Sequence, residues 1–236
     1  MQSQALILRA GEIKENDRLL TALTSEYGVI TAFANGAKKP KSPLHGATQC
    51  YAYGPLEFLR RRDTYVVTDA RAEGVFFAGL AADLSRLALA GYFSALFAEL
   101  SPREEPAPEH LRLALNALHF LSSGLRPQLL LKSVVEMKLI CMAGYKPDLD
   151  TAGHYLDLQR GFMRPDAGPG KVLLPPPVHE AMRFICGAAL ERAFRFALPE
   201  ESLRALSFAS QTYLQYQTGR RFEELAFYEG LINHTL

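Results

Sequence analysis

The chain has 236 residues, of which 48% are hydrophobic and 22% are charged, and its formal net charge is +1. This composition is ordinary for a soluble globular protein, and the small net charge excludes a global field that would attract nucleic acid or membrane. The longest convincing uncharged apolar run, Leu87 to Ala98, is shorter than the roughly 18–20 residues that a membrane-spanning helix requires. We therefore expect a cytoplasmic protein without a signal peptide or membrane segment.

The chain contains three cysteines, and they are far apart in the sequence: Cys50, Cys141 and Cys186. Their odd number and the lack of a C-x-x-C pair argue against a disulfide framework and against a cysteine zinc site. A reducing compartment fits this pattern best. We expect no bound metal and no cofactor.

Motifs that are typical of enzymes are incomplete in this sequence. The stretch HEAMR begins like the zinc motif H-E-x-x-H, but Arg183 stands where the second histidine is required. The stretch GPGK, which ends at Lys171, resembles the end of a phosphate-binding loop. There, however, Pro165 replaces the first glycine and Val172 replaces the Ser or Thr. We therefore predict a protein that is not an enzyme.

Residues 1–78 alternate short β-type runs with turn signals, and each run is about the length of a strand. Five such runs in so short a segment favour a small closed barrel, with the five-stranded oligonucleotide-binding (OB) type as the first candidate. An SH3-like barrel is the nearest alternative. The runs are QALILRA, DRLLTALTSEYG, VITAFANG, CYAYGPLEFL and TYVVTDARAEG.

Residues 79–236 have a helical pattern, so we expect an α+β protein in which a helical bundle domain follows the barrel. A Pro/Gly-rich segment at about 145–177 interrupts the helices and predicts a loop or a short hairpin-like insert. The helices are expected at about 80–100, around Leu111–Leu118, and at about 127–143, 178–195 and 200–217.

Basic residues gather in two clusters near the predicted barrel hairpins. Between Gly36 and Arg62 there are six basic residues and one acid, a net charge of +5. Five phosphate contacts to a single strand would give a log–log salt dependence of binding with a slope of about −3.5. Solvated hairpin ends are the alternative reading. The first cluster is Lys38, Lys39 and Lys41, and the second is Arg60, Arg61 and Arg62.

Two tyrosines lie between these basic clusters. Tyr51 and Tyr53 are two residues apart, so on a strand they would share one face. On an exposed face they could stack nucleic-acid bases, at about 1–3 kcal/mol for each base. On the inner face they would belong to the barrel core, and the periodicity leaves both possibilities open.

One lysine in the helical part stands in strongly apolar surroundings. Lys132 lies near the start of a predicted helix, with Leu131 and Met142 close to it in the sequence. A cation beside an apolar groove can hold a partner peptide with an acidic, hydrophobic end. The alternative is a lysine whose stem covers the core while its charge reaches solvent.

Three stretches together resemble the RecO family of bacterial recombination mediator proteins, and the similarity in layout extends over essentially the whole chain. They occur in the family's order. They are ENDRLLTALTSEYG at Glu15–Gly28, GAKKPKSPLHGATQ at Gly36–Gln49, and AGYKPDLD at Ala143–Asp150.

The resemblance implies a non-enzymatic, nucleoid-associated DNA repair protein with an N-terminal OB-fold and a helical domain. Such proteins bind single- and double-stranded DNA, anneal complementary strands, and engage the acidic C-terminal tail of the single-stranded DNA-binding protein, SSB. With RecR they help RecA to load onto SSB-coated single strands in recombination and repair of DNA damage. The alternative is a protein-interaction adaptor that docks SSB or RecR and binds DNA only incidentally.

The resemblance also implies roles for individual residues. It assigns DNA binding to the lysine cluster, less directly to Arg18 and the arginine cluster, and SSB-tail binding to Lys132. Many family members carry a four-cysteine zinc module after the PDLD motif, but residues 151–170 here contain no cysteine. We therefore expect an insert without zinc, because a structural site needs about four ligands. Packing would hold it instead, for example by Tyr155, Leu158 and Phe162.

Overall fold

The computed structural model describes residues 1–62 and 64–233. By compactness the described chain divides into two units, one of Met1–Ser123 with the residues from Tyr228 onward, and one of Gly124–Phe227. The boundary predicted at residue 78 falls inside the short helix α2 (Phe77–Ala81). The domain boundary at residue 78 therefore stays a prediction. The compact N-terminal unit extends beyond it and includes the three helices that follow the strands.

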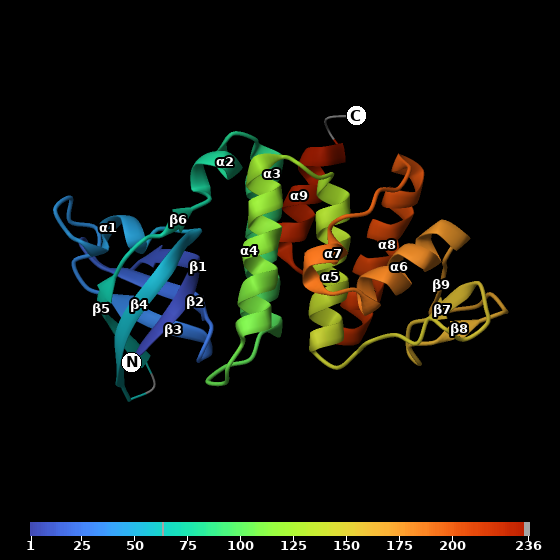
Figure 1. Ribbon diagram of the computed structural model, residues 1–236, viewed down its shortest axis with the longest axis horizontal. Helices are drawn as coiled ribbons and strands as arrows, with labels where there is room; N and C mark the ends of the chain where they lie inside the picture. Colours follow the sequence, from blue (N-terminus) through green and yellow to red (C-terminus); the bar gives the residue numbers. More distant parts are fainter. Residues whose placement is uncertain (63, 234–236) are drawn as a thin grey trace. The chain divides into compact units, whose positions relative to one another are not determined.

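Among the described residues, five strands close into the predicted OB-type barrel (Figure 1). The neighbours follow the order β1-β2-β3-β5-β4, and β1 pairs back with β4 to complete the ring. The β3–β5 pairing is parallel and the others are antiparallel; short β6 (Gly74–Val75) adds to β4. The barrel strands are β1 (Gln2–Glu12), β2 (Arg18–Thr24), β3 (Gly28–Ala34), β4 (Ala52–Arg61) and β5 (Thr64–Ala70).

Inward-facing side chains fill the barrel interior. Many are small, such as Ala22 and Ala32, which lets the strands curve tightly around a narrow core. The ring of Phe58 packs edge-on against Tyr27 and Tyr65, with centroid distances of 5.5 and 5.2 Å. Because the interior is occupied by side chains, a ligand of this barrel has to bind on its outer surface.

Three helices follow the barrel in the N-terminal unit: α2, α3 (Leu84–Leu100) and α4 (Pro108–Ser123). The helix predicted at about 80–100 is present over Leu84–Leu100, but its predicted start is wrong, since Asp83 has extended backbone and caps α3. Its carboxylate accepts hydrogen bonds from the backbone N–H groups of Ser85 and Arg86, at 2.8 and 3.4 Å. The loop between α3 and α4 meets the barrel, where the backbone N–H of Val29 donates to the carbonyl of Pro102 at 2.8 Å.

The second unit is built on α5 (Gln128–Met142) and α8 (Glu200–Thr218), with α6 (Pro176–Gly187) and α7 (Leu190–Ala193) beside them. One helix predicted over 178–195 is wrong: it ends at Gly187, and an extended backbone at residues 188–189 separates α6 from α7. Helix α9 (Glu223–Asn233) was not predicted. In the described part of the chain, every helix is too short or too polar to span a bilayer.

The insert between α5 and α6 forms a small antiparallel sheet in the order β8-β7-β9. Of the three side chains expected to hold it, Leu158 is buried, whereas Tyr155 and Phe162 are half-buried. The amide of Gln217 on α8 donates to the carbonyl of Leu158 at 2.7 Å, which ties the insert to the helices. The strands are β7 (Tyr155–Asp157), β8 (Met163–Arg164) and β9 (Lys171–Leu173).

Candidate nucleic-acid interface

The basic loop, residues 35–48 between β3 and β4, is anchored to the turn that joins β1 to β2. Gly36 adopts a positive φ of 68°, and its N–H donates to the Asp17 carboxylate at 2.8 Å. The backbone N–H of Lys38 donates to the carbonyl of Asn16 at 3.0 Å. These bonds fix the loop's first turn before any ligand is present.

The second half of the basic loop is held by Arg18 of β2. Its guanidinium donates to the carbonyl of His45 at 2.8 Å and to the hydroxyl of Thr48 at 2.9 Å. The short helix α1 (Leu44–Ala47) lies within this half, and Leu44 is buried in the barrel core. Arg18 therefore holds the second half of the basic loop in place through these hydrogen bonds. Its contact with DNA stays a prediction.

The three lysines of the basic loop differ in their surroundings. The ammonium of Lys38 lies 2.8 Å from the carboxylate of Glu12, and its side chain is only 25% exposed. The hydrogen bond from Lys38 and its charge lower the pKa of the Glu12 carboxyl. Lys39 and Lys41 are exposed. They are consequently the lysines of this loop with most freedom to contact a phosphate.

The arginine cluster lies at the turn between β4 and β5. Arg60 lies 3.0 Å from the carboxylate of Glu104, and its guanidinium carbon is 6.0 Å from the centre of the Tyr65 ring. Arg61 and Arg62 are exposed, and Arg62 adopts a positive φ of 53°. This turn therefore presents charge to solvent, while Arg60 is partly engaged within the protein.

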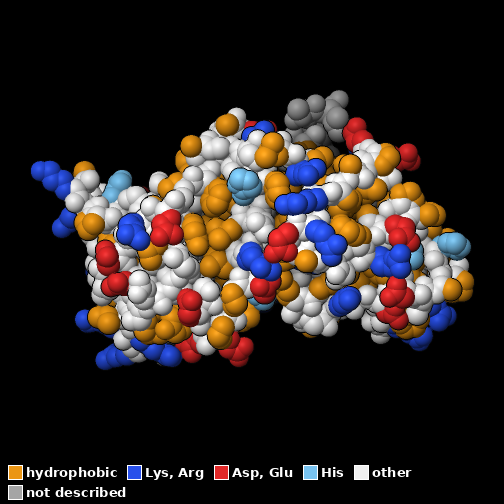
Figure 2. Space-filling model, viewed as in Figure 1, with side chains coloured by type: hydrophobic (Ala, Val, Ile, Leu, Met, Phe, Trp, Pro, Cys, Tyr) orange, Lys and Arg blue, Asp and Glu red, His pale blue; other side chains and the backbone are white. Residues whose placement is uncertain are grey.

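The two basic clusters belong to different connections of the barrel, the lysines to the loop between β3 and β4 and the arginines to the turn between β4 and β5. Figure 2 shows Lys and Arg side chains at two separate places on the barrel, one over the loop that carries α1 and one below, at the β4–β5 turn. β4 has 10 residues, and a strand rises about 3.3 Å per residue, so β4 itself is roughly 30 Å long. On the face that Figure 2 shows, the two clusters are therefore separate.

The aromatic candidates do not form a shared platform. Tyr51 has a positive φ of 64° and precedes β4, so the alternation of strand faces does not apply to it. Its side chain is 7% exposed and its hydroxyl bonds to Ser94, and burial raises its pKa to about 12. This corrects the prediction of a stacking role for Tyr51, which is a core residue. Tyr53 is half-buried, and its contact with DNA stays a prediction.

The predicted SSB-tail residues are mostly inside the second unit. Lys132 is 1% exposed, and its ammonium lies 2.9 Å from the carboxylate of Glu136 on the same helix. It also donates to the carbonyl and hydroxyl of Ser207 on α8, at 3.3 and 3.2 Å. Leu131 is fully buried and Met142 is half-buried. The prediction that Lys132 presents a free cation to a peptide is therefore corrected.

An open groove of about 340 Å³ on α6 and α7 places a cation beside an exposed apolar ring, as was predicted for Lys132. It is lined by Phe184, Arg192 and the Arg183–Glu180 ion pair, among others. The Phe184 ring is exposed and packs edge-on against Phe196 at 5.5 Å. In Figure 2, basic and acidic side chains lie among hydrophobic ones in this region. The sequence pattern did not indicate this site, because its residues come together only where α6 ends and the chain bends into α7.

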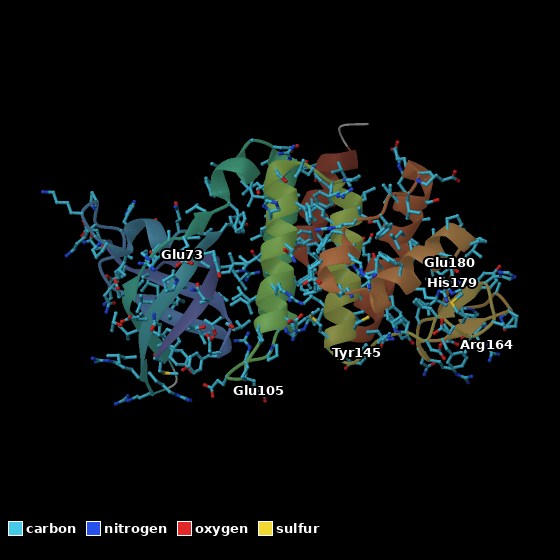
Figure 3. All side chains as sticks on the ribbon, in the orientation of Figure 1. Glu73, Glu105, Tyr145, Arg164, His179 and Glu180 are labelled. Carbon is cyan, nitrogen blue, oxygen red and sulfur yellow. The ribbon has the colours of Figure 1, made fainter. Side chains whose placement is uncertain are left out.

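The residues of the two incomplete enzyme motifs, HEAMR and GPGK, form hydrogen bonds and ion pairs within the protein. His179 bonds through Nε2 to the carbonyl of Leu149 at 2.7 Å, near the start of α6 (Figure 3). Arg183 lies 2.9 Å from the Glu180 carboxylate, and Lys171 lies 2.6 Å from that of Asp166. Across residues 1–62 and 64–233, no cluster of three or more His, Cys, Asp or Glu side chains is arranged to hold a metal ion.

Comparison with known proteins covers both parts of the chain. The model for the N-terminal domain of recombination protein O matches residues 1–76, and the model for its C-terminal domain matches residues 81–226. Proteins named DNA repair protein RecO from Acetivibrio thermocellus and Bacillus subtilis are each 25% identical to this chain. The alignments cover 98% and 97% of it, and 97% and 93% of the relatives.

A third relative of the same name, from Pelotomaculum thermopropionicum, is 34% identical over 65% of this chain and 59% of its own length. The two family models together span most of the sequence, and the closed N-terminal barrel agrees with them. The chain belongs to the recombination protein O (RecO) family.

Proposed function

We propose that this chain acts in DNA repair as a non-catalytic recombination mediator that binds single- and double-stranded DNA and anneals complementary strands. The observation that carries the proposal is the anchored basic loop, which holds Lys39 and Lys41 exposed at one end of the barrel. Membership in the RecO family supports a DNA-repair role, as do relatives named DNA repair protein RecO. We place this activity in the cytoplasm, at the nucleoid.

Annealing on such a surface needs charge neutralisation rather than a reacting group. Lysines that contact phosphates release condensed counterions and reduce the repulsion between two strands. A loop that is already ordered loses little conformational entropy when DNA binds to it. Phosphate contacts also leave the base edges free to pair. The near-neutral net charge of the chain restricts DNA to the local basic clusters.

The full role that we propose includes protein partners. The chain would engage the acidic C-terminal tail of SSB and, together with RecR, help RecA to load onto SSB-coated single strands. The support for RecR and RecA is the resemblance to the family alone. For the SSB tail, the groove on α6 and α7 adds a chemical argument, because it combines the exposed Arg192 with an exposed phenylalanine.

The DNA-binding proposal is tested by fluorescence polarisation with a labelled single-stranded oligonucleotide over a series of salt concentrations. The Lys39→Ala/Lys41→Ala variant should bind more weakly to every sequence. Its log–log salt slope should be shallower by about 1.4, because two phosphate contacts contribute roughly 0.7 each. Adding Lys38→Ala should change the slope less, since Glu12 already neutralises that lysine.

The matched control is Arg160→Ala/Arg195→Ala, which removes the same charge from exposed positions in the other unit. Its slope should equal that of the wild type. If the lysine variant and this control have the same affinity and slope as the wild type, the basic loop does not bind DNA. If the wild type itself does not bind, the adaptor role becomes the better explanation.

The second candidate function is a protein-interaction adaptor, and the α6–α7 groove is the observation that favours it. We propose that its occupant is the SSB tail, whose acidic residues complement Arg192 and whose hydrophobic end suits Phe184; Arg183 is already paired with Glu180 and Asp150. Arg192→Ala should weaken binding of a labelled SSB-tail peptide by about tenfold, since a charge-assisted hydrogen bond is worth roughly 1.5–3 kcal/mol. Arg204→Ala, an exposed arginine on α8, is the control.

The same variants separate the two roles. An Arg192→Ala protein that loses peptide but keeps its DNA affinity would support separate surfaces for DNA and protein. Equal peptide affinity for Arg192→Ala, Arg204→Ala and wild type would exclude this groove as the tail site.

A further inference from the structure

Two cysteines that are distant in the sequence meet in the second unit. Cys141 lies in the last turn of α5 and Cys186 in the last turn of α6. Both thiols are free and half-buried, and the Cys186 thiol is hydrogen-bonded to Cys141. Neither cysteine belongs to the proposed DNA surface, and the sequence spacing gave no sign that they are neighbours.

The ends of α5 and α6 are held together around this thiol pair. The ammonium of Lys138, one turn before Cys141, donates to the carbonyl of Ala188, two residues after Cys186. On the other side, the hydroxyl of Tyr213 on α8 donates to the carbonyl of Tyr145 at 3.0 Å, just beyond the end of α5 (Figure 3). These bonds hold the ends of α5 and α6 in place, so the two thiols are neighbours because of how the second unit packs.

The surroundings give the two thiols different characters. The hydrogen bond from Cys186, together with the charges of Lys138 and Lys146, lowers the pKa of Cys141. The same hydrogen bond and burial raise the pKa of Cys186. Burial raises the pKa of the Tyr213 hydroxyl to about 12, and negative charge on the neighbouring cysteines would act in the same direction. The hydroxyl of Tyr213 therefore stays protonated. Of the two, Cys141 is therefore the thiol that loses its proton more readily, and Cys186 is the thiol that keeps its proton beside it.

We propose that Cys141 and Cys186 are an oxidation site at which a peroxide converts the two neighbouring thiols into a disulfide. The Cys141 thiolate attacks hydrogen peroxide: an S–O bond forms, the O–O bond breaks, and hydroxide leaves and takes up a proton as water. The Cys186 sulfur then attacks the sulfenic acid, so that the S–S bond forms, the S–O bond breaks, and water leaves with the thiol proton. In total, two thiols and one peroxide give one disulfide and two waters.

The disulfide would join the last turns of α5 and α6 and enclose the whole insert in a covalent loop. A cross-link of this kind restricts the unfolded chain and the motion of the enclosed segment. A cellular dithiol would reverse the step by thiol–disulfide exchange. The site fits a reducing compartment, where such bonds form transiently as redox sensors.

The first test uses the full-length wild-type protein and Cys50, a half-buried thiol in the other unit, as its internal reference. Iodoacetamide at neutral pH should alkylate Cys141 at least about tenfold faster than Cys50. One equivalent of hydrogen peroxide should remove the mass of two hydrogen atoms and produce a peptide in which Cys141 is linked to Cys186. Dithiothreitol should restore the original mass.

Single variants separate the two roles, with a cyclic 1,3-dione as the trap for sulfenic acid. Cys186→Ser should accumulate the dione adduct at Cys141, whereas Cys141→Ser should give neither adduct nor cross-link. Cys50→Ser should behave like the wild type. The proposal is overturned if wild-type Cys141 is alkylated no faster than Cys50, or if peroxide leaves the two cysteines unlinked. Both of these readouts come from the wild type, so a folding defect in a variant cannot obscure them.

Discussion

The Glu136→Gln variant is expected to unfold with a free energy about 3–5 kcal/mol below that of the wild type. The substitution keeps the shape of the side chain but removes the carboxylate that lies 2.9 Å from the ammonium of Lys132. Lys132 is 1% exposed, and its other hydrogen-bond acceptors are the neutral carbonyl and hydroxyl of Ser207. A buried ammonium without its carboxylate is costly. Urea denaturation followed by circular dichroism measures the loss.

The double variant Lys132→Met/Glu136→Gln is the informative comparison. It removes both charges, and the glutamine amide can still accept from the hydroxyl of Ser210, which donates to Glu136 at 2.6 Å. We expect it to recover more than half of the stability lost in the single variant, because neutral pairs often replace buried ion pairs at little cost. Lys146→Met, at an exposed position, should change stability little. A loss below about 1 kcal/mol in Glu136→Gln would contradict this description of the pair.

The buried pair also changes how partner binding should be tested. A Lys132→Glu variant would place a second carboxylate beside Glu136 in the interior, so lost binding of an SSB-tail peptide would report a damaged fold. Variants in the exposed groove, such as Arg192→Ala, avoid this ambiguity.

The Gly28→Ala variant is the second change with a large expected effect, a loss of about 3–5 kcal/mol. Gly28 begins β3 with a positive φ of 59°, which L-residues adopt at a cost. A Cβ at this position would also lie 2.1 Å from the carbonyl oxygen of Pro102, so the α3–α4 loop would have to move. That movement would break the hydrogen bond from Val29 to Pro102. The fall in melting temperature measures the effect.

Gly36→Ala is the matched control, since it has nearly the same backbone conformation without the clash. Its φ is +68°, and the nearest atom to an added Cβ is Cδ of Lys39, at 3.8 Å. We expect it to cost only the conformational strain, about 1–2 kcal/mol. Equal losses in the two variants would show that the contact with Pro102 is not important.

The barrel could be predicted from the sequence because its signals are local. Alternating apolar residues and turn residues mark each strand, and a closed barrel follows from five short strands in so short a segment. The errors in the helical part have physical reasons. Asp83 ends one predicted helix by capping the next, and the extended residues 188–189, directly after Gly187, divide another.

The candidate site was predictable only in part. Charge clustering identified the basic loop, but the neighbours that decide the role of each residue come from distant parts of the chain. Arg18 is committed to His45 and Thr48, and Lys132 to Ser207 of α8. The thiol pair depends on the packing of α5 against α6. Such pairings depend on the tertiary structure, and the periodicity of the sequence does not indicate which distant residues will meet.

The parallel seam between β3 and β5 has a consequence for the dynamics of the barrel. In the described chain its register pairs Ala32 with Tyr65 and Phe33 with Val66, whereas β2 and β3 pair along their whole length. A short seam is the place where local opening costs least free energy, so its amide hydrogens should exchange earliest among the barrel strands. The basic loop starts directly after β3 and leads to β4. A ligand that binds this loop only when the barrel is closed would therefore slow amide hydrogen exchange in the β3–β5 pairing.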